Sequence, residues 1–146
     1  MEGTELLNAT KEAMVELSDK INFAGIQSSF KEGRYHHEIA HGMDIPSSGA
    51  AQYFRNLAAE AEASPEVLSK VPMDKVQEVY DSAREALDTD LEGSIMFYAN
   101  VLSDKSKAGT KMTDEDKEKM KPCLAAMKAL IEYRHVKDAY TPRGGD

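Results

Sequence analysis

Apolar residues recur at intervals of three and four along most of this chain, which is the spacing of amphipathic helices. The pattern predicts helices over residues 4–24, 34–43, 50–63, 73–87, 91–102 and 113–139. No segment shows the period of two that is typical of a half-buried strand. We therefore expect an all-α fold, a compact single-domain bundle of five to seven helices over residues 1–141, with a flexible tail over 142–146.

Turn-forming and capping residues predict where several of these helices begin and end. Gly42 and Pro46 are expected to stop the helix over 34–43, and residues 46–49 to form a loop before the next helix. Residues 103–112, rich in Ser, Lys and Gly, are expected to form a second loop. Thr113 and Asp116 have the spacing of a capping box at the start of the last helix, which is expected to bend near Pro122. We expect the inner face of that helix to comprise Met120, Leu124, Met127, Leu130 and Ile131.

Charge and composition narrow the classes of function. The 146 residues carry a formal net charge of -8, which argues against binding to nucleic acid and against docking to an anionic membrane. No apolar run is long enough to span a bilayer, and the first residues lack the layout of a signal peptide. The single cysteine, Cys123, has no partner for an internal disulfide. We expect a cytoplasmic protein whose partner is a protein or peptide.

The most distinctive motif is His-Glu-x-x-His, formed by His37, Glu38 and His41. Residues four apart share one face of a helix, so the two imidazoles could bind a single zinc ion. Glu38 would then lie beside a zinc-bound water and act as its general base. The motif therefore predicts a zinc site with Glu38 as its catalytic residue.

This stretch resembles the zincins, the His-Glu-x-x-His zinc metallopeptidases. It is also similar to zincin-like domains of phages and mobile elements, in which such a helix precedes an alanine-rich Glu-x-Glu-Ala segment. The resemblance covers about residues 35–63 and implies hydrolysis of a peptide bond. It implies a third zinc ligand from the second segment, either Glu60 or Glu62, which the expected loop at 46–49 would fold back toward the histidines.

Two further residues are candidates for supporting roles at this site. Asp44 could accept a hydrogen bond from a ligating histidine, and Tyr53 could stabilise the oxyanion.

Zincins place a β-sheet before the motif helix, whereas the first 36 residues here have a helical pattern. A degenerate site or a structural metal is therefore an alternative to an active peptidase.

Two other classes of function remain open. Glu38-x-x-His41 and Glu132-x-x-His135 are the paired motifs of ferritin-like di-metal bundles, for which Glu5 and either Glu85 or Glu92 would supply the remaining ligands. The other alternative is a non-enzymatic helical interaction or structural module. Its support is the acidic composition, the 8 methionines and the lack of a phosphate-binding loop or a nucleophile motif.

Overall fold

The computed structural model describes residues 2–28, 34–103 and 113–142, with side chains for residues 2–24, 42–101 and 113–142. Its elements are α1 (Gly3–Ser28), α2 (Arg34–Ala63), the 3-10 helix η1 (Pro65–Ser69), α3 (Met73–Leu87), α4 (Leu91–Ser103) and α6 (Asp114–Ala139). These ranges contain no strand, so the predicted all-α fold is confirmed. None of the described helices is long and apolar enough to cross a membrane. The loop and tail expected at 103–112 and 142–146 lie almost entirely outside the described residues.

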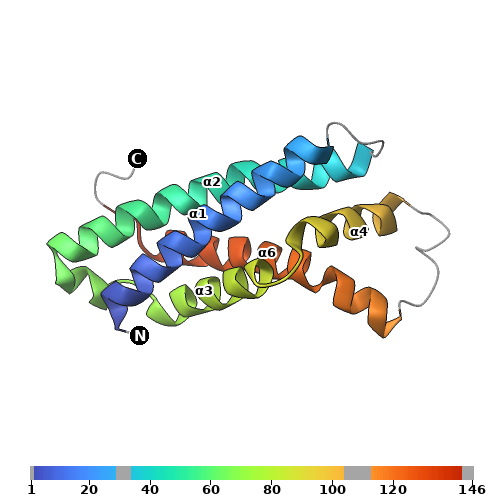
Figure 1. The fold of residues 1–146 in the computed structure, drawn as a ribbon. Helices are drawn as coiled ribbons and strands as arrows, with labels where there is room; N and C mark the ends of the chain where they lie inside the picture. Colours follow the sequence, from blue (N-terminus) through green and yellow to red (C-terminus); the bar gives the residue numbers. More distant parts are fainter. Residues whose placement is uncertain (1, 29–33, 104–112, 143–146) are drawn as a thin grey trace.

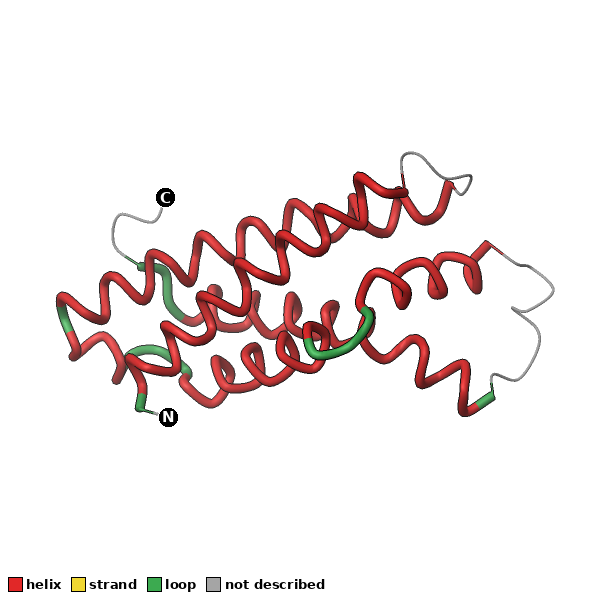
Figure 2. The backbone as a smooth tube through the Cα atoms, viewed as in Figure 1, coloured by secondary structure: helices red, strands yellow, loops and turns green. Residues whose placement is uncertain are grey.

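The helices follow an up-down-up-down course. α1 and α2 form an antiparallel pair, α3 and α4 run one after the other in the second layer, and α6 returns beside them (Figure 1). Figure 2 shows the short loops that join α2 to η1 and α3 to α4. The arrangement is that of a four-helix bundle in which α3 and α4 share the third position. α1 packs mainly on α2 and α3, and α6 packs mainly on α3 and α4, so α1 and α6 lie on opposite sides of the bundle.

One hydrophobic core draws on all the described α-helices. The apolar spacing of three and four predicts one buried face for α1, and this prediction is confirmed, because the residues at that spacing are all buried: Leu6, Leu7, Ala13, Met14, Leu17, Ile21 and Ala24. The capping box at Thr113 and Asp116 is also confirmed: the Asp116 amide donates to Thr113 Oγ1 at 3.1 Å, and the Thr113 amide donates to Asp116 Oδ2 at 3.3 Å. The largest fully buried side chains include Leu7, Met14, Leu17, Ile21, Phe54, Leu57, Val76, Val79, Ile95 and Val136.

The predicted break at residues 46–49 is wrong, because α2 continues through Pro46. Proline removes one helical hydrogen bond and crowds the preceding turn, at a cost of about 3 kcal/mol. Packing offsets this cost, since the buried side of α2 keeps its spacing of three and four across the proline and lies along α1. Ser47 also donates from Oγ to the Asp44 carbonyl at 2.8 Å. The residues of this continuous buried stripe are Met43, Ser47, Ala50, Phe54, Leu57 and Ala61.

The inner face of α6 differs from the expected one. Leu124 and Ile131 were expected to point inward, but 44% and 55% of their surfaces are exposed. Smaller residues form most of the buried side instead, and they allow α3 to approach closely. The buried residues of α6 are Met120, Pro122, Cys123, Ala125, Ala126, Ala129, Leu130, Tyr133 and Val136.

Candidate functional site

The predicted metal helix forms the first turns of α2. The backbone is helical from Arg34 onward, so positions 37 and 41 lie about one turn apart on the same helix. The side chains of His37, Glu38 and His41 lie outside the described residues. Their roles as zinc ligands and general base therefore stay predictions.

The predicted third ligands, Glu60 and Glu62, lie near the other end of α2. Because the helix is continuous, the 19 residues from His41 to Glu60 span about 28 Å along its axis. Glu62 accepts a hydrogen bond from Asn8 Nδ2 at 3.2 Å, and Glu60 accepts one from the hydroxyl of Tyr140. These carboxylates tie the end of α2 to α1 and to the end of α6. The hairpin that was expected to bring either of them to the histidines does not form.

Tyr53 has a structural role in this fold. Its hydroxyl donates to backbone carbonyls at the end of α6, those of Tyr140 and Val136, and its ring lies edge-on to Phe54 and Tyr133. Burial, followed by the neighbouring tyrosines and Glu60, raises the pKa of its phenol. The predicted contribution of Tyr53 to an oxyanion site is therefore not supported. Asp44 is half-buried, and its part as a partner of a ligating histidine stays a prediction.

The residues of the di-metal alternative are spread over the bundle. Glu5 is exposed at the start of α1, and the antiparallel pairing of α1 with α2 places it at the end opposite position 38. Glu132 contacts Lys75 Nζ at 3.3 Å and His135 Nδ1 at 3.4 Å, between α3 and α6. Within the ranges whose side chains are described, no three His, Cys, Asp or Glu residues are grouped to hold a metal ion.

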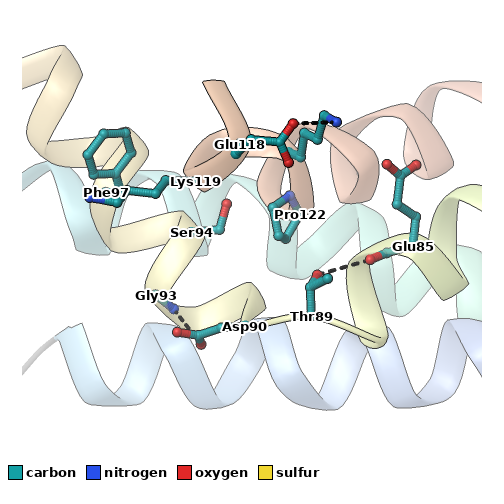
Figure 3. A pocket seen from close by; sticks show the side chains of 10 residues that line it. Glu85, Thr89, Asp90, Gly93, Ser94, Phe97, Glu118, Lys119 and Pro122 are labelled. Atoms are coloured by element: carbon teal, nitrogen blue, oxygen red, sulfur yellow. Dashed lines mark hydrogen bonds and ion pairs between the residues drawn. The ribbon is translucent and has the colours of Figure 1, made fainter. Parts of the chain in front are cut away.

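A cavity of about 490 Å³ lies where the α3–α4 turn faces the first half of α6. Figure 3 shows Thr89, Gly93, Ser94 and Phe97 on the α3–α4 side, facing Glu118, Lys119 and Pro122 of α6. Pro122 has no amide hydrogen to donate to the Glu118 carbonyl, so α6 lacks one helical hydrogen bond beside the cavity. The next amide, that of Cys123, donates to Ser94 Oγ at 2.9 Å and joins α6 to α4.

The polar groups around this cavity are mostly engaged in local contacts. Asp90 Oδ1 accepts from the Gly93 amide at 3.0 Å, and Glu118 pairs with Lys121 at 2.8 Å. Lys119 Nζ lies 5.4 Å from the centre of the Phe97 ring. Burial raises the pKa of the neighbouring Cys123 thiol to about 11, which disfavours the reactive thiolate. The described lining therefore provides space and apolar contact, without a nucleophile held beside a base.

A second feature lies on the solvent side of α6. We define the α6 surface as Lys117, Lys121, Leu124, Lys128, Ile131 and His135, whose successive spacings of four and three place them on one face. All six are exposed. The alternation of lysines with large apolar residues at helical spacing is the sequence pattern that could have revealed this face. Leu124 and Ile131 were expected in the core, so this face was not predicted.

A groove of about 330 Å³ between α2 and α6 adjoins the α6 surface. Arg134 and Lys137 line it from α6, and Ile45, Pro46 and Gly49 line it from α2. Arg134 lies three positions beyond Ile131, so the groove and the α6 surface are neighbours on the helix. Ile45 is 71% exposed. Among the described residues, four large hydrophobic side chains are exposed, and three of them, Ile45, Leu124 and Ile131, lie on or beside α6.

Comparison of the chain with family models, with curated proteins and with solved structures finds no match.

Proposed function

We propose that this chain is a protein-binding helical module, and that its α6 surface docks an acidic amphipathic helix of a partner. The observation that carries the proposal is the exposure of Leu124 and Ile131 in one stripe with three lysines. A single exposed leucine is ordinary on a protein surface. Apolar residues aligned along a helix and flanked by like charges instead match the way an amphipathic helix recognises another helix.

The charge of this region supports an acidic partner. The six positions of the α6 surface include three lysines and no carboxylate, whereas the chain has a net charge of -8 and the whole of α6 carries six basic and six acidic residues. Lys117, Lys128, Arg134 and Lys137 are exposed along this stretch. Basic residues concentrated on one side of an otherwise acidic molecule steer acidic partners to that side, and salt weakens the attraction.

A basic and apolar helix face is also compatible with an anionic bilayer. The acidic remainder of the chain disfavours that surface, since it would be repelled by anionic headgroups. We therefore favour the protein partner and treat membrane binding as an outcome of the test.

The test uses a synthetic acidic amphipathic helix, with leucines on one face and glutamates beside them, titrated into the isotope-labelled chain. We expect NMR shift changes confined to α6 and to the neighbourhood of Ile45, and weaker binding at high salt. The variant Leu124→Glu/Ile131→Glu should lose this binding by at least tenfold, because it places carboxylates opposite carboxylates. The matched control, Ala59→Glu/Ala63→Glu, adds the same charge at exposed positions of α2 and should bind normally.

Three results would reject the proposed surface: no binding of the acidic helix, equal binding of a lysine-substituted helix, or unchanged binding by the Leu124→Glu/Ile131→Glu variant. Binding to phosphatidylserine vesicles in preference to the peptide would assign the α6 surface to a membrane.

A zinc site at His37 and His41, with Glu38 as general base of a peptidase, is the second candidate function. The observation that favours it is the helical backbone through positions 34–41, which suits an i, i+4 pair of ligands. Since Glu60 lies about 28 Å from position 41 along α2 and Glu62 lies farther still, a third ligand has to come from elsewhere.

Two substitutions test the zinc candidate. His41→Ala is expected to abolish zinc binding, because it removes a ligand, whereas Glu38→Gln should keep the metal and lose peptide hydrolysis. Zinc content and stabilisation by added zinc are measured for both variants and for His135→Ala, which lies on α6 and serves as the control. Equal zinc behaviour of the wild-type chain and His41→Ala would exclude this site.

A further inference from the structure

We propose that the acidic helix docked by the α6 surface is α1 of a second copy of this chain, which gives head-to-tail assembly. The inference rests on the proposed function of the α6 surface and adds the identity of its partner. It is carried by a second exposed stripe, on α1, whose charges complement those of α6.

We define the α1 surface as Glu5, Glu12, Glu16, Asp19 and Phe23. Their spacings of seven, four, three and four place them on one helical face, and all five are exposed. The stripe thus presents four carboxylates and ends in Phe23, whose surface is 52% exposed. Glu16 also contacts Arg84 Nη1 at 3.4 Å. Because substitution of Glu16 would break this ion pair within the chain, the test below substitutes other acidic positions.

The α1 and α6 surfaces match in length and in chemistry. Each stripe runs over 18 residue steps, or about 27 Å of helix. The α6 surface carries Lys117, Lys121 and Lys128 together with two exposed aliphatic side chains, and the α1 surface carries carboxylates together with an exposed ring. If the two helices pair antiparallel and in register, Glu12 lies opposite Lys128 and Asp19 lies opposite Lys121, so the pairing rests mainly on opposite charges.

The position of the two helices decides the kind of assembly. α1 and α6 lie on opposite sides of the bundle (Figure 1), so two copies cannot satisfy both surfaces in one symmetric contact. Each contact instead leaves one free α1 surface and one free α6 surface, and growth continues into a ring or an open chain.

The experiment uses two full-length variants, each with one surface blocked. Glu12→Gln/Asp19→Asn/Phe23→Ser removes the charge and ring of the α1 surface, and Leu124→Glu/Ile131→Glu blocks the α6 surface. Sedimentation velocity should show that the wild-type chain grows beyond a dimer with rising concentration and dissociates in high salt. Each variant alone should be monomeric. An equimolar mixture should form a one-to-one dimer and stop there, because only one intact surface of each kind remains.

The control Glu66→Gln/Asp81→Asn removes two exposed carboxylates outside both surfaces and should assemble like the wild type. A monomeric wild type at millimolar concentration, or assembly that persists in either blocked variant, would overturn the inference. If the wild type is monomeric but still binds the acidic peptide, the proposed function stands and the self-association alone is rejected. Circular dichroism of each variant verifies that loss of assembly is not loss of folding.

Discussion

Replacing Phe54 with Ala is expected to lower the free energy of unfolding by about 3–5 kcal/mol, the usual cost of deleting a buried aromatic side chain. Phe54 is fully buried on the inner face of α2. The centre of its ring lies 5.2 Å from the ring centre of Tyr53 and 6.1 Å from that of Tyr133. The first pair is edge-on and the second is tilted, and both arrangements add to the packing energy. The substitution removes both the apolar contact and these ring interactions, and it leaves a cavity between α2 and α6.

The measurement is urea denaturation followed by circular dichroism at low protein concentration. The matched control is Phe23→Ala, since Phe23 is 52% exposed and should cost less than about 1 kcal/mol. Similar losses of stability from both substitutions would contradict the packing described for α2 and α6.

Replacing Pro46 with Ala is expected to stabilise the protein by about 2 kcal/mol. A proline inside a helix costs about 3 kcal/mol relative to alanine, and part of this is regained because proline restricts the unfolded chain. Pro46 lies inside α2 and is exposed, so alanine can restore the missing amide hydrogen bond without a steric clash. If residues 46–49 formed a loop, as the sequence pattern suggested, the same substitution would be neutral or destabilising.

The control for this prediction is Pro65→Ala. Pro65 lies at the first position of η1, where a fixed φ angle suits the start of a helical turn. Its replacement should lower stability by about 0.5–1 kcal/mol. Thermal denaturation of both variants therefore compares a proline that opposes its local structure with one that favours it. A destabilised Pro46→Ala variant would indicate that α2 is interrupted.

Pro46 illustrates why α2 was predicted as two helices. Local rules treat Gly42, Pro46 and the serines that follow as a helix end, because each residue disfavours the helical backbone or favours a cap. Such local rules take no account of α1, the helix that packs along α2. Burial of Met43, Ser47 and Ala50 along α1 is a tertiary contribution, and it outweighs the local penalty.

The predicted metal site also depended on a tertiary feature that local spacing does not describe. Spacing alone identified His37 and His41 as residues of one helical face, and the helical backbone there agrees with that part of the prediction. The distance from these histidines to Glu60 depends on whether the chain turns back at residue 46. The residues between His41 and Glu60 do not by themselves determine whether it does. Because α2 is continuous through this region, Glu60 lies at the other end of the bundle, where it accepts a hydrogen bond from Tyr140.

Four features could be predicted from the amino-acid sequence: the helical class, the buried face of α1, the limits of α3 and the capping box of α6. Each of these depends on periodic apolar spacing or on contacts within four residues, which neighbouring residues in the chain are enough to establish. The continuity of α2 and the exposure of Leu124 and Ile131 depend instead on how the helices pack. Apolar residues lie on more than one side of α6, and their spacing does not say which side meets α3 and α4. Close packing buries the side that contains Cys123, Ala126 and Ala129, and Leu124 and Ile131 are left exposed to solvent.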